Sequence, residues 1–291
     1  MSEALRLITP PVAEPVTLEQ FKGLLRLPLA DISRDDTLNL YLTAAREAFE
    51  AYCRIAIVTQ TWLWRLDSFP TVSLTYDRNG YPEFRVPKPP FQSVDFFQYV
   101  DTSGQLQTLT RETSYGTNSA SPFYGYQMDP GGGISPARLT APWARPWAPQ
   151  RLVPANTVLQ FRCGYGGPVK VTTVANSAAI STPGFTFNAD DAPSLVGDVG
   201  AAINIPGAGA DGAALGTNVA SVDAEGNAML ATAATMAVAD ATAYLGDQVP
   251  SRLQLGILFL AQHFYELNAI ADADEPGVIE RLRRHSRNMV S

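Results

Sequence analysis

Apolar residues recur at helical spacing in three stretches of the chain. A threonine at position 17, followed three residues later by glutamine, resembles a capping box and predicts a short helix over 17–26. Two longer stripes predict helices over 35–54 and 250–269, and two aspartates favour the start of the first of these through the helix dipole. The stripes consist of Leu38, Leu42, Ala45, Phe49 and Tyr52, and of Leu253, Ile257, Leu260, Phe264 and Leu267.

Between these helices the apolar pattern changes to a period of two. The segment QTWLWRLDSF alternates, and Asn-Gly at 79–80 and Ser-Gly at 103–104 lie between strand-like residues, which is typical of hairpins. We therefore expect strands over about 58–112 and 157–163. Residues 116–150 are rich in Gly, Pro and Ser and predict a long exposed loop region, which includes Gly131, Gly132 and Gly133.

The end of the chain predicts a last, shorter helix over 276–287. It concentrates four arginines, which are Arg281, Arg283, Arg284 and Arg287. One interpretation is a solvated helix face, and another is docking onto an acidic protein surface, because Arg forms forked hydrogen bonds to carboxylates. Nucleic-acid binding by these arginines is the third interpretation, because the rest of the chain is neutral or acidic and would repel phosphates.

The charge is distributed unevenly. Residues 166–247 hold one basic and eight acidic residues, whereas the rest of the chain holds twenty of each. The same segment is rich in Ala and Gly and lacks Trp, Arg and Cys. Such a shift in composition predicts a separate module inserted between Tyr165 and Gln248.

Short β-like stretches alternate with turns inside this insert. Their spacing of about ten residues predicts a small antiparallel sandwich or barrel. They are GFTFN, AAINI, NVASV and NAMLATAA. The run GAGADG at 207–212 matches G-x-G-x-x-G, but a dinucleotide site needs a helix to begin there, and the strand-like AALGTNVASV follows instead. We interpret this run as a glycine-rich turn.

Candidate chemistry is sparse in a chain of 291 residues with a net charge of −7. Its 46% hydrophobic content suffices for a core, and its negative charge argues against a main role in gripping nucleic-acid phosphates. Two histidines, His263 and His285, and two cysteines, Cys53 and Cys163, form no catalytic, zinc or disulfide pattern. We expect no enzyme activity, no metal and no cofactor. No apolar run is long enough for a membrane helix, and the first fifteen residues do not read as a secretory signal.

Five segments, in their order, resemble the head–tail connector (head-completion adaptor) proteins of tailed bacteriophages and prophages. They are PPVAEPVTLEQFKGLLRL, AAREAFEAYCRIAIVTQTWLWRLDSFP, RVPKPPFQSVDFFQYVDTSGQLQTL, VPANTVLQFRCGYG and VPSRLQLGILFLAQHFYELNA. The resemblance covers both sides of the insert, 209 of the 291 residues. None of these segments is catalytic.

The resemblance implies an α+β fold: a small helical bundle with a β-stranded extension, to which this chain adds an inserted all-β domain. It implies a ring, typically twelvefold, that joins the portal to the tail in the virion neck, with DNA passing through the bore without sequence-specific binding. The implied partners are further copies of the chain, the portal protein and a tail-completion (stopper) or tail-tube protein. No membrane partner is implied, and the chain would be made in the host bacterial cytoplasm.

The resemblance also implies two contact regions. The family's C-terminal segment embraces the portal, which assigns portal docking to 276–291 and its arginines. Loops on the β side receive the next tail component, which makes Gly131, Gly132 and Gly133 candidates for a tail-side or inter-subunit loop. We expect charge reversal at Arg283 and Arg284 to weaken portal binding.

The insert departs from ordinary adaptors and resembles small β modules of phage tail-spike and fibre proteins. We expect it to project outward from the neck, towards fibres or other neck proteins. The alternative is a fibre-attachment or carbohydrate-recognition protein that acts through the insert. Its few aromatic residues, Phe185, Phe187 and Tyr244, offer little surface for stacking on sugars. The sequence leaves open the subunit number, the partner of the insert and the type of tail.

Overall fold

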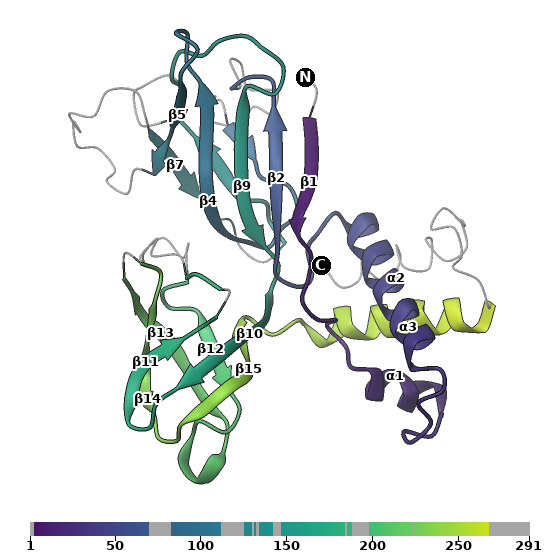
Figure 1. Cartoon of the computed structure of the whole chain (residues 1–291). Helices are drawn as coiled ribbons and strands as arrows, with labels where there is room; N and C mark the ends of the chain where they lie inside the picture. The colour runs from purple at the N-terminus through teal and green to yellow at the C-terminus, as the bar shows by residue number, and fades with distance from the viewer. Residues whose placement is uncertain are drawn as a thin grey trace.

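The fold combines helices, a two-sheet sandwich and a closed barrel in three separate regions of the molecule (Figure 1). The class is α+β, as predicted, with strands making up most of the regular structure. In this computed structural model the described residues are 3–69, 83–111, 125–129, 131, 134–141, 147–183, 185–187, 198–223 and 225–267. No helix within those ranges has the length and apolar character needed to cross a membrane.

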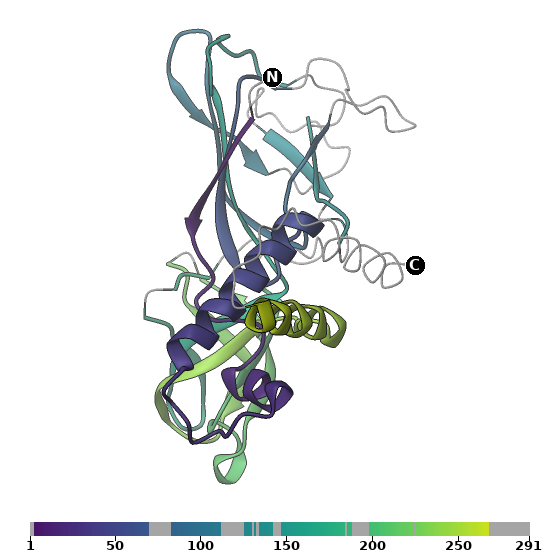
Figure 2. The same ribbon diagram turned by 90° about the vertical axis from the view of Figure 1, so that its right-hand side faces the viewer.

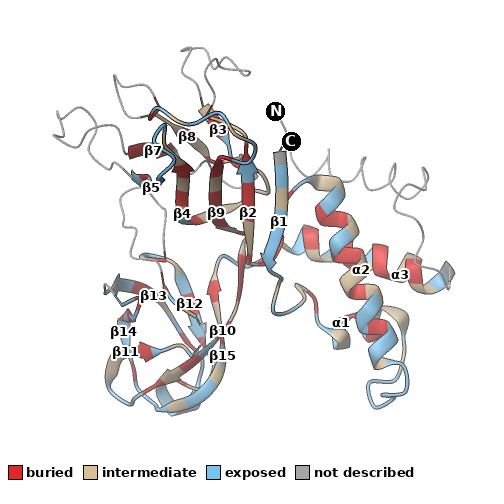
Figure 3. Ribbon diagram, turned by 45° about the horizontal axis from the view of Figure 1, so that its top comes forward, coloured by how far each residue is buried: buried red, intermediate tan, exposed pale blue. Residues whose placement is uncertain are grey.

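Three helices lie close to the predicted ranges: α1 (Leu18–Leu25), α2 (Asp35–Cys53) and α3 (Ser251–Leu267). The capping box of α1 is present, because the Gln20 N–H donates to the Thr17 hydroxyl and the Thr17 N–H donates to the Gln20 side chain. The inward faces of α2 and α3 share one core (Figure 3). Its largest members are Phe21, Leu38, Leu42, Phe49, Ile57, Ile257, Leu260 and Phe264.

The structure does not establish the predicted helical bundle. The core of the helices is completed by Ile55, Ile57 and Val58, which lead directly into a sheet, and α1 has only two turns. Tyr52, predicted on the α2 stripe, is half-buried. The predicted helix over 276–287 lies outside the described residues.

Five antiparallel strands form the larger sheet, in the order β1–β2–β9–β4–β5. They are β1 (Glu3–Thr9), β2 (Gln60–Leu66), β9 (Thr157–Cys163), β4 (Phe91–Val100) and β5 (Leu106–Thr108). A smaller sheet, β3–β8–β7–β6, shares its core. Its strands are β3 (Glu83–Arg85), β8 (Arg138–Thr140), β7 (Gly125–Asp129) and β6 (Thr110–Arg111). The core between them is aromatic, with Trp64, Phe69, Phe84, Phe97, Tyr99, Tyr126 and Trp147.

The interpretation of residues 116–150 as an exposed loop region is wrong for the part that the structure describes. Strands β7 and β8 form there, and Met128, Leu139 and Trp147 are buried in the sandwich core. Each strand is only three to five residues long, so its alternation is hidden among turn-forming glycines and prolines. The Ser103-Gly104 turn is confirmed as the β4–β5 connection, whereas the Asn-Gly pair at 79–80 lies outside the described residues.

The insert forms a closed six-stranded antiparallel barrel, one of the two predicted forms, in the order β10–β11–β14–β13–β12–β15. Its strands are β10 (Gly166–Thr173), β11 (Ser177–Ser181), β12 (Ala202–Ile205), β13 (Leu215–Val222), β14 (Ala228–Ala234) and β15 (Val238–Gly246). The run at 207–212 is a turn with one short 3₁₀ segment before β13, which confirms that no helix begins there. The predicted strand GFTFN is wrong, because its described residues 185–187 are not in a strand.

The chain enters and leaves the barrel at adjacent positions. Gly166, which opens β10, pairs with Gly246, which closes β15, and the Asp247 N–H donates to the Tyr165 carbonyl at 3.0 Å. The two ends of the inserted segment are therefore held side by side, so the surrounding chain can accept it without changing its own path.

A buried charged network joins the helices to the sandwich. Arg46 on α2 donates to Glu50 at 2.9 Å and to Glu14 at 2.8 Å. Glu50 in turn accepts from the Ile57 N–H and the Gln60 side chain, both at 2.8 Å. Burial raises the pKa of Glu50, against the lowering effects of the Ile57 N–H and the Arg46 charge. One carboxylate thus connects the end of α2 to the start of β2.

Candidate functional site at the junction of the sheet and the barrel

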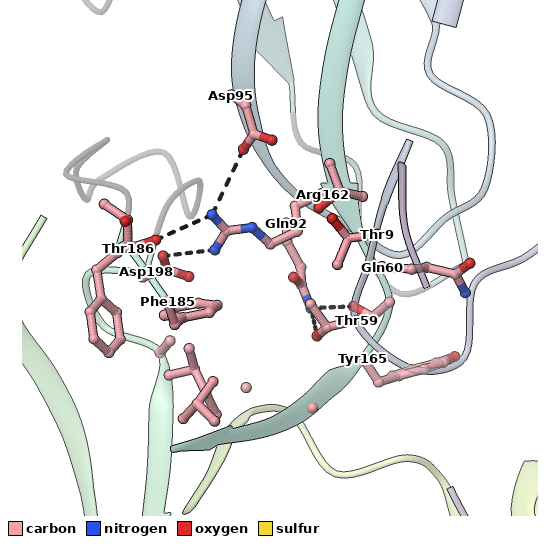
Figure 4. A pocket seen from close by; sticks show the side chains of 18 of the residues that line it. Thr9, Thr59, Gln60, Gln92, Asp95, Arg162, Tyr165, Phe185, Thr186 and Asp198 are labelled. Carbon is pink, nitrogen blue, oxygen red and sulfur yellow. Dashed lines mark hydrogen bonds and ion pairs between the residues drawn. The ribbon is translucent and has the colours of Figure 1, made fainter. Parts of the chain in front are cut away.

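A cleft of about 1070 Å³ lies between the five-stranded sheet and the barrel (Figure 4). One wall comes from β2, β4, β9 and the end of β1 with the residues after it. The other comes from the barrel and includes residues 198–202 and 245–247. Both charged and aromatic side chains line it, including Asp95, Arg162, Phe185 and Asp198. These side chains show how the two β units are connected.

Arg162 is the central side chain of the cleft. It leaves β9 and points towards the barrel, where its guanidinium donates to Asp198 at 3.1 Å and to the Thr186 carbonyl at 3.4 Å (Figure 4). On the sheet side it forms an ion pair with Asp95 at 3.7 Å, and its guanidinium lies 4.9 Å from the centre of the Phe185 ring. One side chain therefore holds both units through charge and cation–π contact.

Next to Arg162, the chain that leads from the sheet into the barrel is held by side-chain hydrogen bonds and by close backbone packing. The Gln92 side chain donates to the Thr59 hydroxyl and to the Gly164 carbonyl, at 2.8 and 2.9 Å. Gly164 has a φ of +121°, and a Cβ there would lie 2.4 Å from the Val58 carbonyl oxygen. Only glycine fits where these two chain segments cross, so the connection between sheet and barrel is short and tightly packed.

The ion pairs of Arg162 with Asp95 and Asp198 connect the two units across the cleft. No group of three or more His, Cys, Asp and Glu residues able to hold a metal ion occurs in the described part of the chain. Both cysteines are free; burial raises the pKa of Cys53 to about 11 and that of Cys163 well above its usual value. Thiols that remain protonated are poor nucleophiles. His263 is half-buried on α3, and its Nε2 has no hydrogen-bond partner within the described residues.

The sequence-predicted site residues are mostly beyond the described structure. Arg281, Arg283, Arg284, Arg287, His285, Gly132 and Gly133 lie outside it. Gly131 is described: it is exposed, has a φ of +72° and contributes to the lining of the cleft. A Cβ at Gly131 would lie 2.7 Å from the Ser135 carbonyl, so the position requires glycine. The structure thus places one of the three predicted loop glycines at the cleft.

The barrel's three aromatic residues lie close to or within packed regions. Phe185 lies against the Arg162 guanidinium and makes an edge-to-face contact with Phe187, their ring centres 5.0 Å apart. Phe187 is buried in the barrel core. Tyr244 is half-buried, and burial raises the pKa of its hydroxyl. None of them is a free, flat platform for stacking on a sugar ring.

Sequence reasoning missed the Arg162–Asp198 pair. Arg162 occupies an outward position in the alternating strand TVLQFRC, where a charged residue is ordinary. Asp198 lies 36 residues later in a Gly-rich stretch. The sequence holds no signal that connects the two, because their contact depends on how the barrel sits against the sheet.

Comparisons with known proteins add three similar structures. No protein-family profile matches the chain, and no curated protein sequence matches it. A chain from the neck of an empty GTA particle, computed with C6 symmetry, has a TM-score of 0.46 and 13% identity. Chains from the virion of a native gene transfer agent (GTA) particle, and from the neck of the native particle with C12 symmetry, have TM-scores of 0.44 and 0.42 and identities of 17% and 15%. Each match covers 96% of this chain and 94% of the other. All three TM-scores lie below 0.5, and the likeness by itself assigns neither a family nor a role.

Proposed function

We propose that this chain is a structural subunit of the neck of a tailed virion, where it forms a ring that joins the portal to the tail and surrounds the DNA exit channel. The observation that carries this function is the order of the five connector-like segments. The described parts of these segments supply α1, the second half of α2 with β2, β4 with β5, β9 and α3. They therefore account for α1, α3, the second half of α2 and most of the larger sheet, while the barrel lies outside the series.

The chemistry of the junction supports a passive role. Arg162 is engaged by two carboxylates, a carbonyl and a ring, and Gln92 by a hydroxyl and a carbonyl. A joint of this kind resists displacement of the barrel relative to the sheet. Such an arrangement fits a structural role, in which the chain holds its neighbours in place and catalyses no reaction.

The remaining assignments follow from the resemblance. Arg281, Arg283, Arg284 and Arg287 dock on the portal, and the loop of Gly131, Gly132 and Gly133 faces the tail or a neighbouring subunit. The barrel projects outward from the neck and contacts fibres or another neck protein. Charge reversal at Arg283 and Arg284 is expected to weaken portal binding in a pull-down with the full chain, and unchanged binding would remove that assignment.

Particles from the virus or prophage that encodes the chain provide the direct test. Antibody labelling and electron microscopy are expected to locate the chain at the vertex between capsid and tail, in a fixed number of copies per particle. Particles assembled without it are expected to be tailless heads. Labelling on fibres or capsid faces, or normal tails in its absence, would contradict a neck role.

The barrel's role as a separate module has its own test. The ends of the segment 166–247 are paired, so a short Gly-Ser linker between Tyr165 and Gln248 can replace it. The shortened chain is expected to keep its helical core and its ring. Loss of the folded core would contradict modularity, and loss of fibres from otherwise normal particles would identify the barrel's partner.

A further inference from the structure

The barrel is connected to the helices as well as to the sheet. Tyr165, the last residue before β10, packs its half-buried side chain against the helical core, and Val249, shortly after β15, belongs to the same core. Figure 1 shows the chain running from β15 directly into α3 where the three regions meet, and in Figure 2 the helices lie in front of that point. The chain therefore contacts the helical core both where it enters the barrel and where it leaves.

Main-chain hydrogen bonds fix the place where the barrel starts and ends, formed by Tyr165, Gly166 and Asp247 and called here the barrel root. The Tyr165 N–H donates to the Ile57 carbonyl at 3.1 Å, and the Thr59 N–H donates to the Gly166 carbonyl at 2.9 Å. Asp247 closes the root through its N–H, which donates to the Tyr165 carbonyl at 3.0 Å. The segment that leads from the helical core into β2 is thus bonded to the first residues of the barrel.

Ile57 connects the barrel root to the end of α2. Its carbonyl accepts from Tyr165, and its N–H donates to the Glu50 carboxylate at 2.8 Å. Glu50 is only 6% exposed and also accepts from the Gln60 side chain at 2.8 Å. A buried carboxylate that loses a donor has little water to replace it. A displacement of Ile57 from the side of the barrel therefore disturbs its bond to α2.

This connection is distinct from the one made by Arg162. The ion pairs of Arg162 run between the sheet and the barrel, to Asp95 and Asp198. In Figure 4, Tyr165 points away from the Arg162 guanidinium. The helices pack mainly on one another and make no broad contact with a barrel strand in the described part of the chain. The barrel root is therefore where the barrel and the helices are joined.

We infer that the contacts from Tyr165 through Ile57 to Glu50 couple the barrel energetically to the end of α2. A disturbance of the barrel root then weakens the Glu50 contacts, and a disturbance at Glu50 weakens the root by the same free energy, because such coupling is reciprocal. A partner that binds the barrel and shifts its root thereby alters the helices without touching them. The coupling is a property of the single chain, so its failure would leave the proposed neck role standing.

Hydrogen exchange measured by NMR on the full chain tests the coupling from the side of the helices. Glu50→Ala removes the acceptor of Ile57, and the Asp247 amide at the barrel root is expected to exchange at least about fivefold faster than in the wild type. The Val219 amide, which donates inside the barrel, is expected to exchange at an unchanged rate. Glu47→Ala, an exposed change on the same helix, is the matched control and is expected to change neither amide.

The reverse experiment starts from the barrel. A Cβ at Gly166 would lie 2.6 Å from the Leu245 carbonyl oxygen, so Gly166→Ala disturbs the root from inside the barrel. The Ile57 amide is expected to exchange at least about fivefold faster, whereas the Leu38 amide at the start of α2 is expected to be unchanged. Gly216→Ala on β13 is the matched control, because a Cβ there meets open space, and it is expected to leave the Ile57 amide unchanged.

Arg162→Gln separates the two connections of the barrel. It breaks the ion pairs with the sheet and is expected to leave exchange at the Ile57 amide within about twofold of the wild type. An acceleration equal to that in Gly166→Ala would show that the effect travels through the sheet, and would overturn the inference. Unchanged exchange at Ile57 in Gly166→Ala, or at Asp247 in Glu50→Ala, would also overturn it. If one of these two variants does not fold, the other decides.

Discussion

The two β units of this chain differ in how their sheets end. The barrel closes on itself, since β15 pairs with both β10 and β12, and none of its six strands has a free edge. The larger sheet of the sandwich ends in β1, which pairs within the described residues with β2 alone. A free edge presents unpaired N–H and C=O groups that another chain can use. The barrel is thus complete by itself, whereas the larger sheet of the sandwich ends, within the described residues, in an edge strand.

The two units also differ in the kinds of side chain that fill their cores. In the sandwich, large aromatic side chains fill the core between the two sheets. Phe69, for example, stacks on Trp147 with the ring centres 4.9 Å apart. The barrel interior is filled mainly by aliphatic side chains, such as Val171, Ile205 and Val219, together with the ring of Phe187. The interior of a small closed barrel is narrow and takes mostly aliphatic side chains, whereas the two sheets of the sandwich bury a larger area through aromatic rings.

The largest effect is expected from emptying either core. Phe97→Ala removes a ring that is 1% exposed and is expected to destabilise the sandwich by about 3–5 kcal/mol. Ile205→Ala is expected to destabilise the barrel by about 2–5 kcal/mol. If the units unfold independently, calorimetry will resolve two transitions, and each variant will lower only one of them. A single transition lowered by both variants would mean that the closed unit depends on the open one.

A smaller effect is expected from removing the contact between the units. Arg162→Gln loses the charged hydrogen bond to Asp198 and is expected to cost about 1.5–3 kcal/mol. Hydrogen exchange should rise at the amides of residues 198–202, which line the cleft. The control is Arg65→Gln on β2, an exposed position expected to shift stability by less than about 0.5 kcal/mol. Unchanged exchange in Arg162→Gln would mean that backbone packing alone holds the barrel.

The glycine at the crossing tests that backbone packing. Gly164→Ala combines a positive φ with a backbone clash and is expected to destabilise the chain by about 1–3 kcal/mol. Gly200→Ala is the matched control, since Gly200 also has a positive φ, +87°, but has open space around it. A larger loss of stability in Gly164→Ala isolates the steric part. Equal losses in urea unfolding would show that the crossing is not tightly packed.

The smallest expected effect is on how the free energy of unfolding depends on pH. Its sign differs between Glu50 in the helical region and Asp223 in the barrel. Burial raises the pKa of Glu50, so the folded state binds this proton more tightly than the unfolded chain does. The stability of the wild type relative to Glu50→Gln should therefore be greatest below the ordinary pKa and decline as the pH rises through the folded pKa. In the barrel, hydrogen bonds from Asn227 lower the pKa of Asp223. The stability relative to Asp223→Asn should instead be present above the ordinary pKa and be lost on acidification.

Urea unfolding of the wild type, Glu50→Gln and Asp223→Asn between about pH 3 and 7 measures both differences in stability. This pH range spans the ordinary carboxyl pKa values. A wild-type advantage over Glu50→Gln that grows with pH would mean that the Arg46 charge outweighs burial at this carboxylate.

Local patterns predicted the helices and the existence of the insert. The stripe of Leu253, Ile257, Leu260 and Phe264 is long enough for its period to be unmistakable, and the structure buries all four. Neither β1 nor β7 was predicted, although β1 has seven residues, as many as the predicted strand β2, while β7 has five. In such short segments a few turn-forming or polar residues hide the alternation, and pairing with a neighbouring strand decides the outcome.

The candidate site depended even less on local signals. The capping box at Thr17 involves residues three apart, so the sequence is enough to predict it. The ion pairs of Arg162 join β9 to Asp95 on the neighbouring strand β4 and to Asp198 in the barrel. The exposure of Leu255 and Phe259 on α3 was also missed, because an apolar residue on a helix becomes informative only once the buried face is known.

By itself, the sequence determined what depends on neighbouring residues: the helical periods, the cap of α1, the turn at 103–104 and the distinct composition of 166–247. Only the tertiary structure decided that the insert closes as a barrel, that Arg162 forms ion pairs on both sides of the junction and which sides of α2 and α3 are buried. The reason is physical. Helix formation and turns are set by contacts within a few residues, whereas sheet closure, ion pairing and exposure are set by contacts between segments far apart in the chain.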